Sequence, residues 1–339
     1  MVRIIPTYQT NIPVHPKTPN HDNMRLVVER HEFRSPSEAV DTRIAILWSY
    51  GSGFHKEFLH PLMQRLIKRL RSKPEYNNIH IDFITFDNRT HGDSALLNQS
   101  WINEYKPSWF DFAMDVLQVV NQMKLKQSYD KLIGVSHSSG ACIMLISQFL
   151  EPKTFDGICL MEPVIRTSCT VGPSDTQNSP LVSRILRRQD TFSNREICKK
   201  TLLKSSVWSK LHPEVLENYV NYGFYDTDDG TIKLKCPKEQ ESLLSACGSY
   251  DAYTSCISLK LISVPVHIVF CSAPMIKVTA RSNPGDIAAL SSVITVRTID
   301  GWHNLPGEKP DLLVPEIEVL VDTVRLNQNR SIVYKESRL

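Results

Sequence analysis

Several features that would place a chain in a membrane, in the secretory route or on nucleic acid are missing here. Residues Met1 to Thr7 contain no apolar segment typical of a signal peptide. No apolar run is long enough to span a bilayer. The net charge is only +3 at pH 7, which is too small to indicate nucleic acid or an anionic membrane surface as a partner. We therefore expect a soluble protein with no membrane span, no nucleic-acid partner and no export by the usual route.

The cysteines also lack any pattern. The chain has eight, none in a C-x-x-C pair: Cys142, Cys159, Cys169, Cys198, Cys236, Cys247, Cys256 and Cys271. Scattered cysteines favour free thiols in a reducing compartment over a disulfide framework or a zinc site. The 339 residues, 41% of them hydrophobic, are enough for one large globular domain with room for an inserted subdomain.

One stretch carries most of the chemical information. Leu132–Val135 is an apolar run, a group of very small residues follows, and Ala141–Leu145 is apolar at helical spacing. This pattern predicts a strand, a sharp elbow and a helix, with Ser138 at the tip of the elbow and its hydroxyl exposed above the sheet. The motif is S-H-S-S-G where G-x-S-x-G is usual. A second register centred on Ser136 fits as many positions, but only Ser138 has glycine two residues later, where the turn is crowded.

A second loop has the residues expected of an oxyanion hole. The apolar run Thr42–Trp48 ends in Ser49-Tyr50-Gly51-Ser52-Gly53, and a helix with Leu59, Leu62, Met63, Leu66 and Leu70 on one face follows. Beside an elbow nucleophile, such a loop presents a backbone N–H to the developing oxyanion. By position the two donors are the N–H groups of Ser52 and Ser139. The alternative is an ordinary glycine-rich turn.

The order of apolar and helical segments along the chain predicts the fold class. Short apolar runs alternate with helical patterns, which indicates an α/β fold with a mostly parallel, doubly wound sheet. Residues 164–256 contain no convincing strand and instead show helical patches, so we expect a helical cap inserted above the sheet. The predicted layout is an N-terminal arm (1–22), a core (23–163 and 257–328), the cap (164–256) and a C-terminal tail (329–339). His267 falls mid-strand and is interpreted as a core residue.

The last three residues, Ser337-Arg338-Leu339, are of the Ser-Lys-Leu type that the peroxisomal import receptor binds. The alternative is an accidental tail. We expect a peroxisomal protein with this receptor as a partner.

Together the segments resemble the α/β-hydrolase superfamily over nearly the whole chain. The motifs are W-S-Y-G-S-G-F-H-K-E, D-N-R-T-H-G-D-S, S-H-S-S-G and D-G-W-H-N-L-P-G, the second being similar to the family's D-x-R-G-H-G-x-S turn. The G-F-H-K-E continuation and the Ser-Arg-Leu ending resemble fungal peroxisomal α/β-hydrolases, a group that includes a peroxisomal lipase and hydrolases of host-selective toxin biosynthesis. The resemblance favours the toxin-pathway branch.

The resemblance implies a nucleophile, an acid and a histidine in that order. Ser138 carries over as the nucleophile and His303 as the base. The family usually places its acid after the seventh strand, where this chain reads Cys271-Ser272-Ala273-Pro274-Met275 with no carboxylate, and Asp286 comes late. Glu162, at the end of the sixth strand, occupies a position that some members use and is assigned the orienting role. It could instead cap a helix or form a salt bridge.

These residues predict a serine hydrolase that cleaves a carboxylic ester or acyl thioester through an acyl-enzyme, without metal or organic cofactor. The substrate would be a small acyl compound. Two alternatives stay open: an acyltransferase of the same fold, and a non-catalytic binding protein that has lost its acid.

Overall fold

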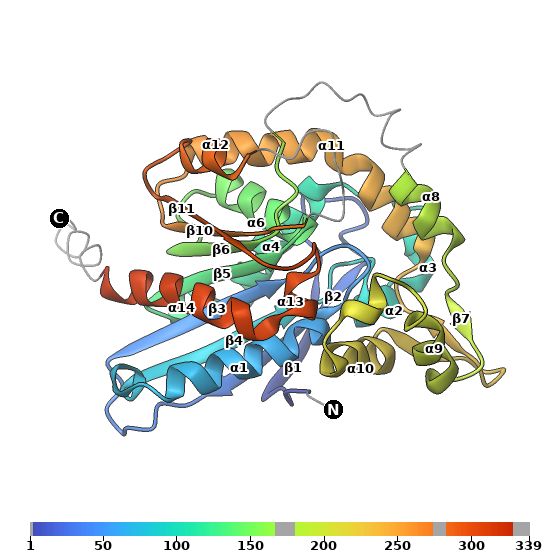
Figure 1. The fold of residues 1–339 in the computed structure, drawn as a ribbon, viewed down its shortest axis with the longest axis horizontal. Coiled ribbons are helices and arrows are strands. Elements are labelled where there is room, and N and C mark those ends of the chain that lie inside the picture. The colour runs from blue at the N-terminus through green and yellow to red at the C-terminus, as the bar shows by residue number, and fades with distance from the viewer. Residues whose placement is uncertain (1–2, 167–179, 274–282, 328–339) are drawn as a thin grey trace.

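The structure is a computed structural model that describes residues 3–166, 180–273 and 283–327. At its centre is a sheet of eight strands in the order β1-β2-β4-β3-β5-β6-β10-β11 (Figure 1). The strands are β1 (Tyr8–Pro13), β2 (Arg25–Phe33), β3 (Thr42–Ser49), β4 (Ile79–Phe86), β5 (Lys131–His137), β6 (Gly157–Met161), β10 (Val266–Cys271) and β11 (Ile294–Ile299). β2 pairs antiparallel with β1 and β4, and all other neighbours are parallel. The mostly parallel sheet predicted from the sequence is confirmed.

The central strands are continuous apolar runs because both faces of the sheet are covered. All eight residues of β4 and all six of β10 are buried. In a parallel sheet of this kind the carboxyl ends of the strands meet at one edge, and side chains that follow them are brought together there.

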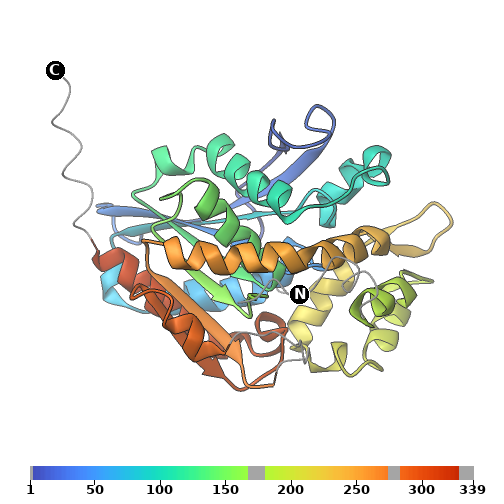
Figure 2. The same cartoon turned by 90° about the horizontal axis from the view of Figure 1, so that it is seen from above.

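Helices cover the two faces of the sheet in separate layers (Figures 1 and 2). One layer contains α1 (His60–Arg71) and α14 (Pro310–Leu326). The other contains α4 (Trp109–Gln122), α6 (Ser139–Leu150), α11 (Lys238–Leu261) and α12 (Pro284–Ala288). Shorter helices are η1 (Lys56–Leu59), η2 (Pro74–Tyr76), α2 (Gly92–Leu97), α3 (Gln99–Ile102), α5 (Leu125–Ser128) and α13 (Leu305–Glu308). No helix within the three described ranges combines the length and apolarity needed to cross a membrane.

The helix that follows the elbow is buried on nearly every side. In α6, ten of twelve residues are buried, from Ser139 to Gln148. α6 packs against α4, α11 and β5. A helix enclosed in this way fixes its own N-terminus, and with it the elbow, against the sheet.

The cap is not purely helical, so that part of the prediction was wrong. It contains α8 (Pro180–Arg187), α9 (Arg195–Leu202), η3 (Trp208–Lys210) and α10 (Pro213–Tyr222), together with β7 (Thr191–Phe192), β8 (Phe224–Asp226) and β9 (Ile232–Leu234). The three strands form a small antiparallel sheet in the order β7-β9-β8. Each has only two or three residues, which is too short for an alternating pattern to be visible in the sequence.

Helix α11 connects the cap to the core. It has 24 residues, and the expected cap boundary at residue 256 falls inside it. Gly248 interrupts the helical pattern, but it is needed where it stands: a Cβ there would lie 2.3 Å from the Trp109 ring. The close approach of α11 to α4 therefore explains the glycine.

The N-terminal end of the chain differs from the expected layout. Tyr8–Pro13, within the expected N-terminal arm, is strand β1 and extends the sheet at its edge. The C-terminal tail with Ser337, Arg338 and Leu339 lies outside the described residues.

Candidate active site

Ser138 stands alone between β5 and α6 in a strained backbone conformation. Its φ is 55° and its ψ is −125°, values that a non-glycine residue rarely adopts. The turn is possible because its neighbours are small: a Cβ on Gly140 would lie 2.3 Å from the Tyr50 carbonyl oxygen, and a Cβ on Gly51 would lie 2.9 Å from the Ser138 Cβ. The predicted strand, elbow and helix are all present.

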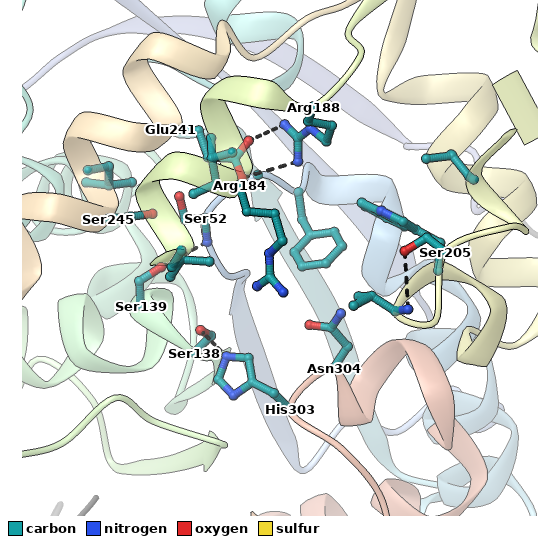
Figure 3. Close-up of a pocket in the computed structure, with 18 of the residues that line it drawn as sticks. Ser52, Ser138, Ser139, Arg184, Arg188, Ser205, Glu241, Ser245, His303 and Asn304 are labelled. Atoms are coloured by element: carbon teal, nitrogen blue, oxygen red, sulfur yellow. Dashed lines mark hydrogen bonds and ion pairs between the residues drawn. The ribbon is translucent and has the colours of Figure 1, made fainter. Parts of the chain in front are cut away.

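The structure brings Glu162 and His303, which follow Ser138 in two separate segments of the chain, to the Ser138 side chain. The Ser138 Oγ lies 2.8 Å from His303 Nε2 (Figure 3). On the other side of the ring, His303 Nδ1 lies 3.2 Å from Glu162 Oε2. The three side chains thus form one chain of hydrogen bonds at the carboxyl edge of the sheet.

Glu162 is held by the neighbouring strand. It follows β6, its backbone N–H donates to the Val269 carbonyl, and its Oε1 accepts from the Cys271 N–H. Both of these partners belong to β10. Because one carboxylate oxygen is fixed by the sheet, the other is aimed at the imidazole.

His137, directly before the elbow, holds the backbone of His303. It is buried, and its Nε2 donates to the His303 carbonyl oxygen at 2.8 Å. Burial lowers the pKa of His137 to about 3, so the ring is neutral and can donate from this nitrogen. This contact was not predicted, because only the fold places residue 303 beside residue 137.

The two sequence registers for the nucleophile are placed very differently. Ser136 lies inside β5, is fully buried, and its Oγ has no hydrogen-bond partner among the described residues. Ser138 lines a cavity instead.

The two residues proposed for the oxyanion hole meet above the elbow. The Ser52 N–H donates to the Ser139 side-chain Oγ at 2.9 Å (Figure 3). Ser139 is the first residue of α6, where backbone N–H groups have no partner within the helix. The Ser52 donor is therefore present at the expected place, but it is directed at a hydroxyl.

A cavity of about 500 Å³ lies over these residues, between the core and the cap. Ser138, Ser139, Ser52 and His303 line it from the core side. Its apolar lining includes Phe54, Leu181, Ile185, Phe192, Leu202, Val207, Trp208 and Leu244. A mostly apolar cavity of this size with a few polar groups at one place is typical of a small-molecule site.

Comparisons with known proteins bear on the fold. No protein-family model matches the chain. Among solved structures, the peroxisomal α/β-hydrolase Lpx1 from Saccharomyces cerevisiae superposes with a TM-score of 0.80 at 21% identity, covering 96% of this chain and 90% of that one. E-2-(acetamidomethylene)succinate hydrolase superposes with a TM-score of 0.65 at 16% identity, covering 93% of this chain and all of that one.

The chain has the α/β-hydrolase fold.

Sequence relatives extend the likeness to fungal α/β-hydrolases. The peroxisomal membrane protein LPX1 of Saccharomyces cerevisiae is 26% identical over 301 residues, which cover 81% of this chain and 74% of the yeast protein. The type I acyl-CoA thioesterase mpaH' of Penicillium brevicompactum is 26% identical over 210 residues, 60% of this chain. The match covers only 45% of the length of that thioesterase. The resemblance to fungal peroxisomal α/β-hydrolases is confirmed.

The other carboxylate considered from the sequence is placed elsewhere. Asp286 lies exposed in the first turn of α12 and forms no hydrogen bond or ion pair within the described part of the chain. His267 is buried in β10 and lies 2.7 Å from the Thr295 hydroxyl and 2.8 Å from Glu316. Its interpretation as a core residue is confirmed.

Behind the loop that carries Ser52 lies a group of charged residues that we call the lysine cluster: Lys56, Glu29, Glu57, Asp87 and Asp93. The Lys56 ammonium is fully buried and contacts all four carboxylates. Asp87 also accepts hydrogen bonds from the Tyr50 hydroxyl and the Lys56 N–H, each at 2.9 Å. The D-N-R-T-H-G-D-S turn therefore fixes the loop that carries Ser52.

The same region contains the donor atoms of a possible metal site. Glu29, His31 and His60 offer atoms within 4.8 Å of one another. However, the Lys56 Nζ lies 3.6 Å from Glu29 Oε1 and already provides a positive charge there. Burial lowers the pKa of His60 to about 3 and that of His31 to about 4, so both rings are neutral, which is the form that binds a metal. The charge of Lys56 is therefore what disfavours a cation at this place.

Proposed function

We propose that the chain is a serine hydrolase that cleaves a carboxylic ester or acyl thioester through an acyl-enzyme. The observation that supports this most is the chain of hydrogen bonds from Ser138 through His303 to Glu162, at the base of a cavity. A serine, a histidine and a carboxylate in this order and contact are what acyl transfer requires.

In the proposed mechanism His303 acts first as a base. Its Nε2 takes the proton of Ser138 as the Oγ attacks the acyl carbonyl, and the same proton is then delivered to the departing alcohol or thiol. Glu162 accepts from Nδ1, which fixes the tautomer and stabilises the positive charge on the ring. Water, activated by His303, then releases the acid from the acyl-enzyme.

We propose that the oxyanion hole includes the Ser139 side chain. The Ser52 N–H is directed at the Ser139 Oγ, so this hydroxyl is free to donate its own proton toward the substrate oxygen. The N–H of Ser139 is the second donor. The Ser52 N–H then acts indirectly, by polarising the Ser139 hydroxyl. Each of the two direct donors, the Ser139 hydroxyl and the Ser139 N–H, is expected to lower the barrier by about 3 kcal/mol.

The relatives support an acyl thioester as one substrate class, because mpaH' is named as an acyl-CoA thioesterase. The peroxisomal relative and the Ser-Arg-Leu ending support import into peroxisomes through the import receptor. From the motifs we further propose a step in fungal host-selective toxin biosynthesis. A fluorescent fusion of the chain should enter peroxisomes, and the same fusion without Ser337–Leu339 should stay in the cytosol. Continued punctate import of the shortened fusion would reject the targeting signal.

A fluorophosphonate probe tests the central proposal. The wild-type chain should be labelled covalently at Ser138, and the Ser138→Ala variant should lose the label. Ser136→Ala serves as the matched control, since it removes the other candidate hydroxyl at the same elbow. Labelling at Ser136 would favour the second register, and a folded but unlabelled wild type would favour a binding protein. For a labelled enzyme, product analysis with and without an alcohol acceptor separates hydrolysis from acyl transfer.

A further inference from the structure

The cavity over Ser138 has an excess of positive charge. Its charged lining residues are three arginines, Arg184, Arg187 and Arg188, and a single carboxylate, Glu241. Arg184 and Arg187 belong to α8, Arg188 follows it, and Glu241 lies on α11. The excess is thus placed in the cap, on the side of the cavity opposite the Ser138–His303 pair.

The three arginines differ in their partners. Arg188 and Glu241 form an ion pair with two contacts, one of them 3.3 Å from Nη1 to Oε1. This pair joins α11 to the residue that follows α8, and it neutralises both charges. In the described ranges, by contrast, no carboxylate oxygen lies within 4.0 Å of Arg184 or Arg187.

Arg184 points into the cavity. Figure 3 shows its guanidinium in the middle of the space, directed toward His303 and Asn304 and away from Glu241. Arg184 is exposed to solvent but has no carboxylate partner within the described ranges, and a bound anion would supply one. Its planar fork matches the paired oxygens of a carboxylate or phosphate.

We infer that Arg184, with Arg187 beside it on α8, binds an anionic group of the substrate and so selects acidic acyl compounds. This rests on the proposed hydrolase function and adds the substrate class. The anionic group has two possible sources: a carboxylate at the far end of the acyl chain, or a phosphate of a coenzyme A leaving group. Both offer the same oxygens to the guanidinium.

Three thioesters separate these sources. Octanoyl-N-acetylcysteamine is neutral, octanedioyl-N-acetylcysteamine carries the terminal carboxylate, and octanoyl-CoA carries the phosphates. For each, kcat/KM is measured with the wild type, Arg184→Gln, Arg184→Glu and Arg184→Lys. The matched control is Lys204→Gln, which removes an exposed positive charge from the cap outside the cavity.

The readout is the ratio of kcat/KM for a charged thioester to that for the neutral one. Arg184→Gln should lower this ratio at least about tenfold, because a charge-assisted hydrogen bond is lost. Arg184→Glu should lower it further, Arg184→Lys should keep part of it, and Lys204→Gln should leave it unchanged. A change in the ratio confined to octanedioyl-N-acetylcysteamine identifies the terminal carboxylate as the group that Arg184 binds. A change confined to octanoyl-CoA identifies a phosphate of coenzyme A. Ratios that stay constant in Arg184→Glu for both would overturn the inference.

A binding measurement keeps the test independent of turnover. Calorimetric titration of the Ser138→Ala variant with octanedioate and with coenzyme A should show binding of at least one of them, weakened at least about tenfold by Arg184→Glu. Equal affinity with and without Arg184→Glu, or no binding of either probe, would reject the anion site. If wild-type protein hydrolyses none of the thioesters but binding depends on Arg184, the proposed hydrolase function fails and the anion site stands.

Discussion

Two polar groups of residues at the carboxyl edge of the sheet are fixed by the same loop, yet they differ in what they face. The hydrogen-bonded chain of Ser138, His303 and Glu162 lies at a cavity, and the lysine cluster is closed off from it. The loop from Tyr50 to Lys56 contacts both: Gly51 packs on Ser138, and Tyr50 and Lys56 bind Asp87. The first group has one carboxylate on one imidazole, whereas the second has four carboxylates around the Lys56 ammonium, with Lys235 also in contact with Asp93 and Arg3 with Glu29.

This difference indicates a division of roles. Polar groups that face a cavity can exchange partners with a substrate, so their hydrogen bonds can change during a reaction. Polar groups that are sealed must satisfy one another, since an unpaired buried charge costs several kcal/mol. We therefore expect substitutions in the first group to change turnover, and substitutions in the lysine cluster to change stability.

The largest effect on turnover, after removal of the nucleophile, is expected for Glu162→Gln. The amide cannot stabilise a charged His303, so kcat for a short acyl ester should fall about 10²- to 10⁴-fold. The free energy of urea unfolding should stay within about 1 kcal/mol of the wild type, because the amide oxygen of the new side chain can still accept from the Cys271 N–H. An unchanged rate would move the acid to another residue and end the contrast between the two groups.

Lys56→Met should have the next largest effect, on stability. It removes the ammonium that contacts all four carboxylates of the lysine cluster, and the free energy of unfolding should fall by about 3–5 kcal/mol. Urea denaturation measures it, with Lys68→Met on the exposed face of α1 as control. Equal stability of the two variants would show that the cluster does not hold the loop.

Glu29→Gln tests the structural role of the lysine cluster through the pH dependence of the free energy of unfolding. Burial raises the pKa of Glu29 to about 7 from a usual value of 4.5, so its proton favours the folded state. This contribution is complete below pH 4.5 and is lost as the pH rises through 7. From pH 5 to pH 8 the variant should therefore gain stability relative to the wild type, on the order of 1–3 kcal/mol.

The measurement for Glu29→Gln is urea denaturation at both pH values, with the exposed Glu38→Gln as a control. If the difference in free energy of unfolding between Glu29→Gln and the wild type is the same at pH 5 and pH 8, the Glu29 carboxylate is already ionised at pH 5 beside Lys56.

The smallest effect is expected for Ser139→Ala. Loss of the Ser139 hydroxyl removes one oxyanion donor but frees the Ser52 N–H to donate directly, so kcat should fall only about tenfold. KM should stay nearly constant, since the contact is made mainly in the transition state. The Ser136→Ala variant is the control at the same elbow. A faster Ser139→Ala enzyme would mean that the hydroxyl only blocks the Ser52 N–H.

Some of these arrangements could be read from short segments of sequence. The elbow could be predicted, because the backbone turn at Ser138 needs Gly140 two residues later and this requirement is local. So could the glycine loop before α1 and the strand before Glu162. The cap strands β7, β8 and β9 could not, because they are held by pairing with one another and are too short to show a period.

Contacts between segments far apart in the chain could also not be predicted from the sequence. The sequence around His137 does not indicate that this side chain binds the His303 backbone. The sequence of α8 and the residue after it does not distinguish Arg184 from Arg188. Their roles depend on which carboxylate or carbonyl the fold places beside them.

The sequence alone determined the strand, elbow and helix around Ser138, the mostly parallel sheet, and the set of residues from which a nucleophile, a base and an acid can be chosen. These follow from local sterics and from the burial of apolar runs. The tertiary structure decided that Glu162 rather than Asp286 meets His303, that the Ser52 N–H is directed at a hydroxyl, and that Arg184 has no carboxylate partner among the described residues. Those outcomes depend on distances between segments far apart in the chain, which only the packed sheet and its cap set.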